Sequence, residues 1–394
     1  MPKSVKENFG AKIEKKSIKS AKSDTGKVLQ SLGSDMGAGG VIKKLLPSSQ
    51  RVNSDKVAAF ALFLHQRQEI LVSRTQNPSY TNQDTKNDIL RTYFFTNIYR
   101  EADTGTKFYR KQMLSQHQDI GSDQLPDIVF QTVVYRLINK KLTFETFGKI
   151  PSAGEWKKFK KFFEEEMRLS KSDSKREKPF TAAHQVMGLD KLMDTIEFVL
   201  KNCQKISRDL IAAKSLERCF NIFQEINNIG GFLAWQITAD LSELKLIKFS
   251  ENVFTCLGPG AKNGLATILN VPSSKEELEL TKQLTRSMDS IFKAMDINFK
   301  YFLGKKLSLK TVEHALCEFF KYWRAVKEGR SKRKYHGMGS VSDNSDQCSV
   351  CTMEPSVMID NIWWLCARCH SMEAGNIGSV TRSLKLENIK CETG

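Results

Sequence analysis

The chain has 394 residues, of which 61 are Lys or Arg and 44 are Asp or Glu, so its formal charge is 61 − 44 = +17. Forty per cent of the residues are apolar, which excludes a wholly disordered chain, and no apolar run approaches the roughly 20 residues that span a bilayer. The positive surplus favours a polyanionic partner, with nucleic acid first and an anionic membrane surface second. No apolar stretch follows the basic N-terminal residues, so we expect no secretory signal and a reducing compartment.

Residues 1–50 differ in composition from the rest of the chain. They hold ten lysines, no arginine and four acidic residues, together with many Ser and Gly. This composition predicts a disordered basic tail. The tail could be a nuclear address, a non-specific tether to phosphates, or only a solvated segment.

Residues 51–326 have a helical pattern nearly throughout. Apolar residues recur at spacings of three and four, as in Leu216, Cys219, Phe220 and Phe223. Alternating β-branched runs are scarce. The sequence therefore predicts an all-α body, followed by a basic linker over residues 327–345 and a small module over residues 346–394.

Within this body we predict one amphipathic helix from Tyr93 to Met113. Such a helix would place Thr96, Arg100 and Asp103 on one stripe, with Asn97 beside it. The cluster could be the wall of a base-binding pocket, or only a surface ion pair of little energetic weight. The candidate pocket residues are Asn97, Tyr99, Arg100 and Asp103.

The stretch Glu225–Leu241 resembles the helix-hairpin-helix motif of DNA glycosylases. In that motif the amides of the hairpin and of the second helix bind a DNA phosphate, with help from the helix dipole. We expect Asn228 to adopt the left-handed conformation of the hairpin glycine that it replaces. The nucleic-acid-binding candidates, including a second glycine-rich string, are Asn227, Asn228, Gly230, Gly231, Gly258, Gly260 and Lys262.

The catalytic positions of those glycosylases do not carry over. The position that matches their lysine is Phe232, and the region 256–264 that matches their catalytic aspartate has no carboxylate. Base excision is therefore disfavoured.

The C-terminal module carries two Cys-x-x-Cys pairs separated by fourteen residues. This spacing is typical of a tetrahedral zinc site, whose four thiolate ligands would be Cys348, Cys351, Cys366 and Cys369. His370 could replace one cysteine. The string Cys366–His370 also matches a haem-attachment motif, which the second Cys pair disfavours. We expect the zinc to be structural and the helical body to fold without it.

A competing interpretation of the module is a nuclease. The segment Asn361–His370 resembles the second half of zinc-bearing HNH endonucleases, which need a His before that Asn as general base. Only Glu354 and Asp360 stand between Cys351 and Asn361, so we disfavour this activity.

Two motifs together resemble the helical domain of phage 5-hydroxymethyluracil DNA kinases and of the related α-glutamyl/putrescinyl thymine pyrophosphorylases. The resemblance covers roughly residues 55–270. The matching residues are Phe95, Thr96, Asn97, Tyr99, Arg100, Glu101, Asp103, Gly258, Pro259, Gly260 and Ala261.

The resemblance implies a glycosylase-like helical fold that acts on a thymine-derived base extruded from duplex DNA. The chain has no Gly-x-x-x-x-Gly-Lys-[Ser/Thr] loop, so it is not a P-loop kinase by itself. Three functions stay open: a nuclear protein that recognises or modifies such a base, a non-catalytic DNA-binding scaffold within a nuclear protein complex, and a zinc-dependent nuclease. We expect DNA as partner, zinc as cofactor and no membrane.

Overall fold

The computed structural model describes residues 38–46, 52–77, 79–117, 122–181, 188–269, 276–329, 357–359, 363–365 and 369. The regular structure in these ranges is almost entirely helical, which confirms the predicted all-α body. None of the helices found there is long and apolar enough to cross a bilayer. The longer helices are α2 (Ala38–Leu45), α3 (Ser54–Gln76), α4 (Asp88–Thr92), α5 (Thr104–Gln116), α6 (Leu125–Ile138), α7 (Lys141–Phe147), α8 (Trp156–Ser172), α9 (Leu189–Ala212), α10 (Leu216–Gln224), α11 (Gly231–Glu243), α12 (Pro259–Ile268), α13 (Glu277–Ala294) and α14 (Leu309–Glu328).

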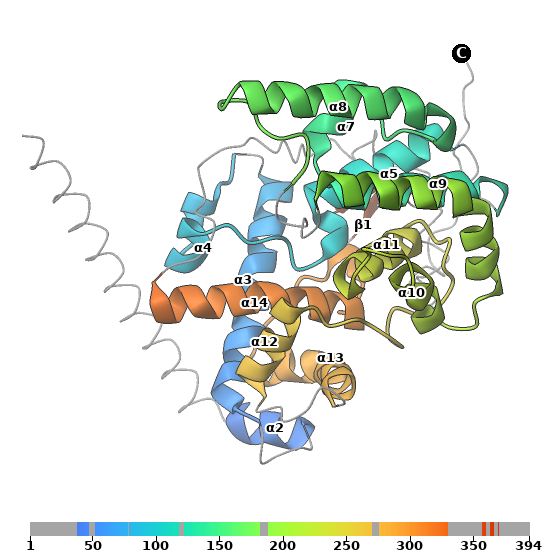
Figure 1. The fold of residues 1–394 in the computed structure, drawn as a ribbon. Helices are drawn as coiled ribbons and strands as arrows, with labels where there is room; N and C mark the ends of the chain where they lie inside the picture. The colour runs from blue at the N-terminus through green and yellow to red at the C-terminus, as the bar shows by residue number, and fades with distance from the viewer. Residues whose placement is uncertain are drawn as a thin grey trace, which may run out of the picture.

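The helices form two lobes, each around its own apolar core (Figure 1). The first lobe consists mainly of α2, α3, α4, α12, α13 and α14, with Phe60, Phe63 and Phe319 in its core. The second lobe consists mainly of α5 to α11, with Phe130, Phe144 and Phe159 in its core. We call the region where the two lobes meet the seam.

Within the first lobe, α12 lies unusually close to α14. A Cβ atom on Gly264 would lie 2.1 Å from the backbone oxygen of Leu316, and one on Gly260 would lie 2.5 Å from Cys317 Sγ. These two glycines therefore allow the helix backbones to approach to a separation that any side chain would prevent. Residues 258–264 read Gly-Pro-Gly-Ala-Lys-Asn-Gly. The second and third glycines of this string, Gly260 and Gly264, therefore serve the packing of α12 against α14.

Part of the N-terminal segment that we expected to be disordered is helical. In α2, Ile42 is fully buried, and Leu46 just after it is 2% exposed. The helix contacts α3 and α13. The lysine-rich composition concealed a short apolar stripe, and burial of that stripe against the first lobe stabilises the helix.

The predicted helix from Tyr93 to Met113 is wrong over residues 93–103, whereas residues 104–113 are helical in α5. Helix α4 ends at Thr92, an extended segment follows, and a 3₁₀ turn (η2, Arg100–Ala102) precedes α5. The Asp103 carboxylate accepts a hydrogen bond from the backbone N–H of Asn97 at 2.9 Å, and the Asn97 amide donates to the Ala102 carbonyl at 2.9 Å. These side chains satisfy backbone groups outside a helix, so the expected stripe does not exist.

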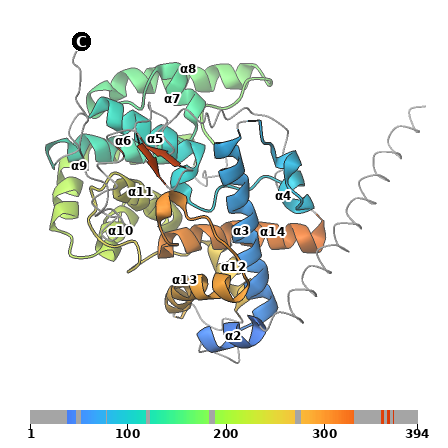
Figure 2. The ribbon, with the colours of Figure 1, turned by 180° about the vertical axis from the view of Figure 1, so that it is seen from behind.

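A C-terminal hairpin packs on the helical body. Strands β1 (Val357–Ile359) and β2 (Trp363–Leu365) pair antiparallel, and Figure 2 shows them beside the seam. Trp363 is 1% exposed, lies edge-on to Phe302 with ring centroids 4.8 Å apart, and donates its indole N–H to the Tyr301 carbonyl at 3.0 Å. The hairpin is therefore part of the first lobe's core. Of the predicted zinc ligands, Cys348, Cys351 and Cys366 lie outside the described residues.

Candidate functional site

Buried charged side chains link the lobes at the seam. Asp240 of α11 is fully buried between two guanidinium groups. Arg100 of η2 donates to its Oδ1 at 2.6 Å, and Arg136 of α6 donates to both of its oxygens. Although burial alone would raise the pKa of Asp240, the two arginines hold this pKa below its usual range. Asp240 is therefore ionised throughout the neutral range.

A second group of charges lies beside the first. The ammonium of Lys310 on α14 is 2% exposed and contacts three carboxylates, those of Glu101, Glu243 and Glu251. Arg110 of α5 lies 3.6 Å from the other oxygen of Glu243. Burial and the neighbouring Glu101 raise the pKa of Glu243 to about 7.

Oxygens of the three glutamates lie within 4.8 Å of one another, which is the spacing of a cation site. Here Lys310 places its own ammonium among them, and its pKa is raised well above the usual value because the carboxylates outweigh the cost of burial. The chain thus supplies the cation, and the cluster acts as an internal ionic link between α14, η2 and α11.

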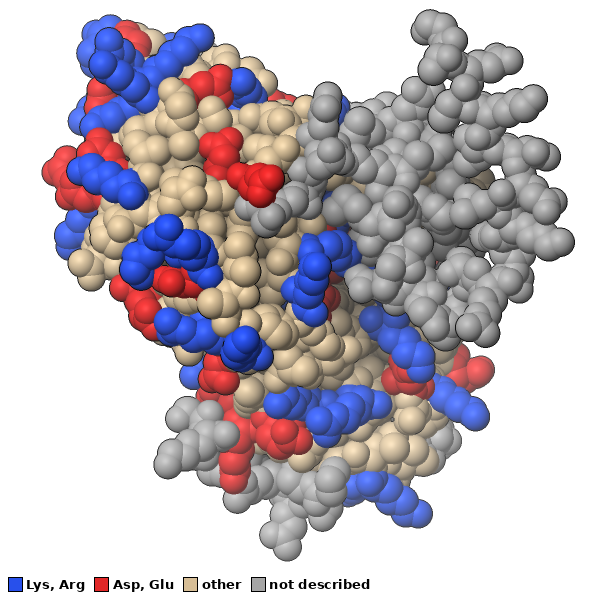
Figure 3. Space-filling model, turned by 90° about the vertical axis from the view of Figure 1, so that its right-hand side faces the viewer, with Lys and Arg blue, Asp and Glu red and all other residues tan. Residues whose placement is uncertain are grey.

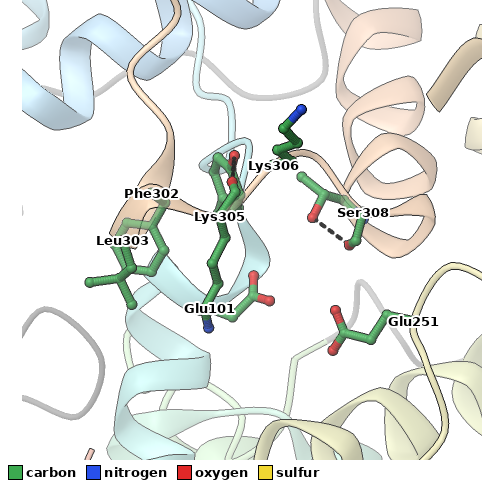
Figure 4. Close-up of a pocket in the computed structure, with 9 residues that line it drawn as sticks. Glu101, Glu251, Phe302, Leu303, Lys305, Lys306 and Ser308 are labelled. Atoms are coloured by element: carbon green, nitrogen blue, oxygen red, sulfur yellow. Dashed lines mark hydrogen bonds between the residues drawn. The ribbon is translucent and has the colours of Figure 1, made fainter. Parts of the chain in front are cut away.

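A small cavity of about 60 Å³ adjoins this cluster (Figure 4). The carboxylates of Glu101 and Glu251 face it, and Phe302, Lys305 and Ser308 form further parts of its wall. Pockets for small organic ligands measure roughly 300–1,000 Å³, whereas a buried water needs about 10–15 Å³. The cavity has room for a few waters and none for a nucleobase.

The four predicted pocket residues make internal contacts. Tyr99 is 2% exposed and donates its hydroxyl to the Lys305 carbonyl at 2.6 Å, and Arg100 is engaged by Asp240. Asn97 accepts a hydrogen bond from Arg67 of α3 at 2.7 Å. Together these contacts link the 94–103 segment to α3, α11 and the loop before α14.

Asp103 faces α14. Its Oδ2 lies 3.6 Å from His314 Nε2, and the same ring nitrogen is 3.1 Å from both Thr96 Oγ1 and the Asn97 carbonyl. Burial raises the pKa of Asp103, although His314 opposes that shift. The structure thus brings Asn97 and Asp103 together, while Tyr99 and Arg100 point to other neighbours.

The predicted hairpin lies between α10 and α11. Asn228 has φ = +67°, the left-handed conformation that we expected there, and its side-chain amide donates to Thr195 Oγ1 at 3.1 Å. A Cβ atom on Gly230 would meet nothing within 4 Å, and Gly230, which precedes α11, is exposed. Asn227 accepts from Thr195 at 3.4 Å through its carbonyl.

The N-terminal ends of α11 and α12 adjoin, and we call this place the α11–α12 junction (Gly230–Phe232 and Cys256–Gly260). The Phe232 ring lies 3.6 Å from where a Gly258 Cβ would be, and a Cβ on Gly231 would lie 3.4 Å from Cys256 Sγ. Lys262, predicted to bind phosphate, pairs with Glu277 at 2.8 Å.

The junction contains a carboxylate that sequence reasoning missed. Glu313 of α14 accepts hydrogen bonds from the backbone N–H of Gly258 and from the indole of Trp235. The region 256–264 lacks its own carboxylate, and the fold supplies one from a distant helix. The available signal was the position of Glu313 on the apolar face of α14, between the buried residues Val312 and Leu316.

Positive and negative side chains are mixed on part of the described surface. On the face in Figure 3, lysine and arginine side chains are interspersed with acidic ones. Elsewhere in the described residues, exposed pairs include Arg168 with Glu165 and Lys205 with Asp209. Exposed pairs of this kind contribute little to stability and lower the local positive potential.

The two lobes and the α10–α11 hairpin make up one all-α body, and it is this body that a known family matches. The model of the family "5-hmdU DNA kinase, helical domain" matches residues 54–331, which include nearly all of both lobes. The chain belongs to this family. The match ends before the C-terminal hairpin.

A 5-hmdU DNA kinase of Bacillus phage SP10 is 23% identical over 266 residues. The aligned region covers 61% of this chain and 40% of the phage protein, so the chain spans less than half the length of that relative. No solved structure matches the chain.

Proposed function

We propose that this protein binds duplex DNA and recognises a thymine-derived base of the 5-hydroxymethyluracil type. Membership of the 5-hmdU DNA kinase helical-domain family, over nearly all of both lobes, is the observation that carries this proposal. The α11–α12 junction supports it, because the exposed start of a helix at Gly230 suits a phosphate of the DNA backbone. Such a base would be extruded from the duplex to reach the protein.

Phosphorylation of the base would also require a bound phosphate donor, and the sequence has no P-loop to hold one. We therefore propose that this chain presents the base, while another protein or domain binds the donor. The match to a phage protein gives no support to the nuclear location that we expected from the basic tail.

A scaffold without base recognition is the second candidate. This candidate is supported by the contacts of Tyr99 and Arg100. Their side chains bind Lys305 and Asp240 inside the protein, so they do not face a surface where a base could bind.

Binding to labelled duplexes separates the two candidates. We expect wild-type protein to prefer a duplex with one 5-hydroxymethyluracil over its thymine counterpart, and to bind both more weakly as salt rises from 50 to 200 mM. Gly230→Val should weaken binding to both duplexes about tenfold, because the new side chain blocks a charge-assisted phosphate contact. Fluorescence anisotropy measures each affinity.

Gly154→Val is the matched control, since Gly154 also has open space around its Cβ position and lies away from the junction. It should bind like wild type. If wild-type protein binds both duplexes equally and Gly230→Val loses both, the protein is a scaffold. Absence of DNA binding would contradict both candidates.

We also propose that Cys348, Cys351, Cys366 and Cys369 bind one zinc ion. The two Cys-x-x-Cys pairs carry this proposal, and the described Cys369 fits it: its sulfur is buried and lies 3.9 Å from the Arg110 guanidinium, which would stabilise a thiolate. Protein purified under reducing conditions should contain about one zinc per chain, and Cys366→Ser should release it.

Because the adjoining hairpin packs in the first lobe, we now expect zinc loss to lower the melting temperature of the helical body as well. Elemental analysis and thermal unfolding measure the two effects. Full-length protein without zinc would contradict the assignment.

A further inference from the structure

Glu313 differs from the other deeply buried carboxylates. Among the described residues, four carboxylates are less than a tenth exposed. Asp240, Glu243 and Glu318 each have an arginine or lysine within ion-pair distance. Glu313, 8% exposed, has no such ion pair in the part of the chain that the structure describes. An unpaired buried carboxylate destabilises a fold, so its presence indicates a role beyond packing.

A glycine and an exposed aromatic ring adjoin Glu313. The backbone N–H of Gly258 contacts the carboxylate, and the ring of Phe232, which is 43% exposed, lies 3.6 Å from where a Gly258 Cβ would be. Glycine at this position lets a ligand approach the backbone closely. An exposed aromatic ring beside it offers a planar base a stacking partner.

The charge of Glu313 determines which chemical groups can bind at the start of α12, where Gly258 contacts the carboxylate. A phosphate at the start of α12 would lie beside an unpaired carboxylate and be repelled. A neutral hydroxyl or imide N–H would instead donate a hydrogen bond to it. The start of α11 at Gly230 has open space and remains the end that suits a phosphate.

We propose that Glu313 is a specificity-determining residue, whose carboxylate accepts a hydrogen bond from the hydroxymethyl group of an extruded base stacked on Phe232. This inference rests on the proposed function and names the group that would distinguish the modified base from thymine.

The protonation state of Glu313 provides the test. Burial raises the pKa of Glu313 to about 7. The charged and titratable groups around it are Arg100 of η2, Cys256 before α12 and Cys317 of α14. Burial raises the pKa of both thiols to about 11, so they stay neutral near pH 7, and Arg100 is paired with Asp240. Glu243, 4.0 Å from Arg100, also has a pKa of about 7, so a pH-dependent step near 7 reports Glu313 if Glu313→Gln abolishes it.

The experiment compares duplexes that carry 5-hydroxymethyluracil, 5-methoxymethyluracil or thymine at one position. The methoxy group keeps the oxygen but cannot donate a hydrogen bond. We expect wild-type protein to prefer the hydroxymethyl duplex about tenfold at pH 8, since a hydrogen bond to a charged acceptor contributes on this scale. The preference should fall as the pH drops through about 7 to 6, because the carboxylate becomes protonated.

Glu313→Gln should show a smaller preference that does not change with pH. It should also melt higher than wild type at pH 8 and equally at pH 5, because it removes an unpaired buried charge. This melting comparison shows that the variant folds. Glu318→Gln, which alters a paired carboxylate on the same helix, should keep both the preference and its pH dependence.

The outcomes separate the two proposals. Equal binding of all three duplexes by wild-type protein would overturn the proposed function and this inference with it. A wild-type preference that Glu313→Gln retains, with the same pH dependence, would overturn only the role of Glu313. A wild-type preference shared by the methoxymethyl duplex would likewise exclude the donated hydrogen bond.

Discussion

Replacing Asp240 with asparagine should lower the free energy of unfolding by about 3–5 kcal/mol, the usual effect of removing one partner from a buried ion pair. The substitution keeps the shape of the side chain but leaves Arg136 buried without the carboxylate it contacts, and leaves Arg100 with only Glu243 at 4.0 Å. Urea denaturation followed by circular dichroism measures the change.

The effect should depend on pH. The folded state lowers the pKa of Asp240, so its ionised form stabilises the protein above the pKa of an unfolded aspartate and loses that effect as the pH falls through the lowered value. The difference between wild type and Asp240→Asn should therefore shrink in acid. Glu165→Gln, which removes an exposed pair with Arg168, is the control and should change stability by less than about 1 kcal/mol. Equal effects of the two variants would refute an ionic seam.

Trp363→Ala should lower the free energy of unfolding by a similar amount, about 3–5 kcal/mol, because it leaves a cavity against Phe302 and removes the indole hydrogen bond to the Tyr301 carbonyl. Trp363 lies outside the region that the family model matches, yet the cavity would open in the core of the first lobe, which lies mostly inside that region. The same denaturation experiment measures it.

Met358→Ala on the partner strand is the matched control. Met358 is 43% exposed, so its loss should cost little. If Trp363→Ala unfolds like wild type, the hairpin does not contribute to the core. A large effect would show that the helical body depends on the C-terminal segment.

The sequence predicted local features better than long-range ones. Helical periodicity correctly predicted the all-α body, and the resemblance to a glycosylase hairpin correctly predicted the left-handed conformation of Asn228. Both features are set by residues that are neighbours in the sequence. The family motif at residues 95–103 was recognised, but its side chains were assigned to a helix that the structure does not have there. Thr96, Arg100 and Asp103 have helical spacing, yet tertiary hydrogen bonds hold the segment extended.

The partners that explain this site are far apart in the chain. Arg100 pairs with a residue 140 positions away, and Lys310 meets a glutamate 209 positions away. A single sequence contains no signal for such pairs. Glu313 was missed for the same reason, since its contacts with Gly258 and Trp235 exist only in the folded chain.

The contact between α12 and α14 has a consequence for how further members of this family are sought. Gly260 and Gly264 stand four residues apart on one helix face, and both lie against the 316–317 backbone and side chains of α14. A glycine-rich string after a turn is commonly taken as a sign of nucleotide binding. In this fold the four-residue spacing of the two glycines instead reflects the close packing of α12 against α14. Searches that require small residues at these two positions would therefore select chains by shared architecture, whatever chemistry those chains perform.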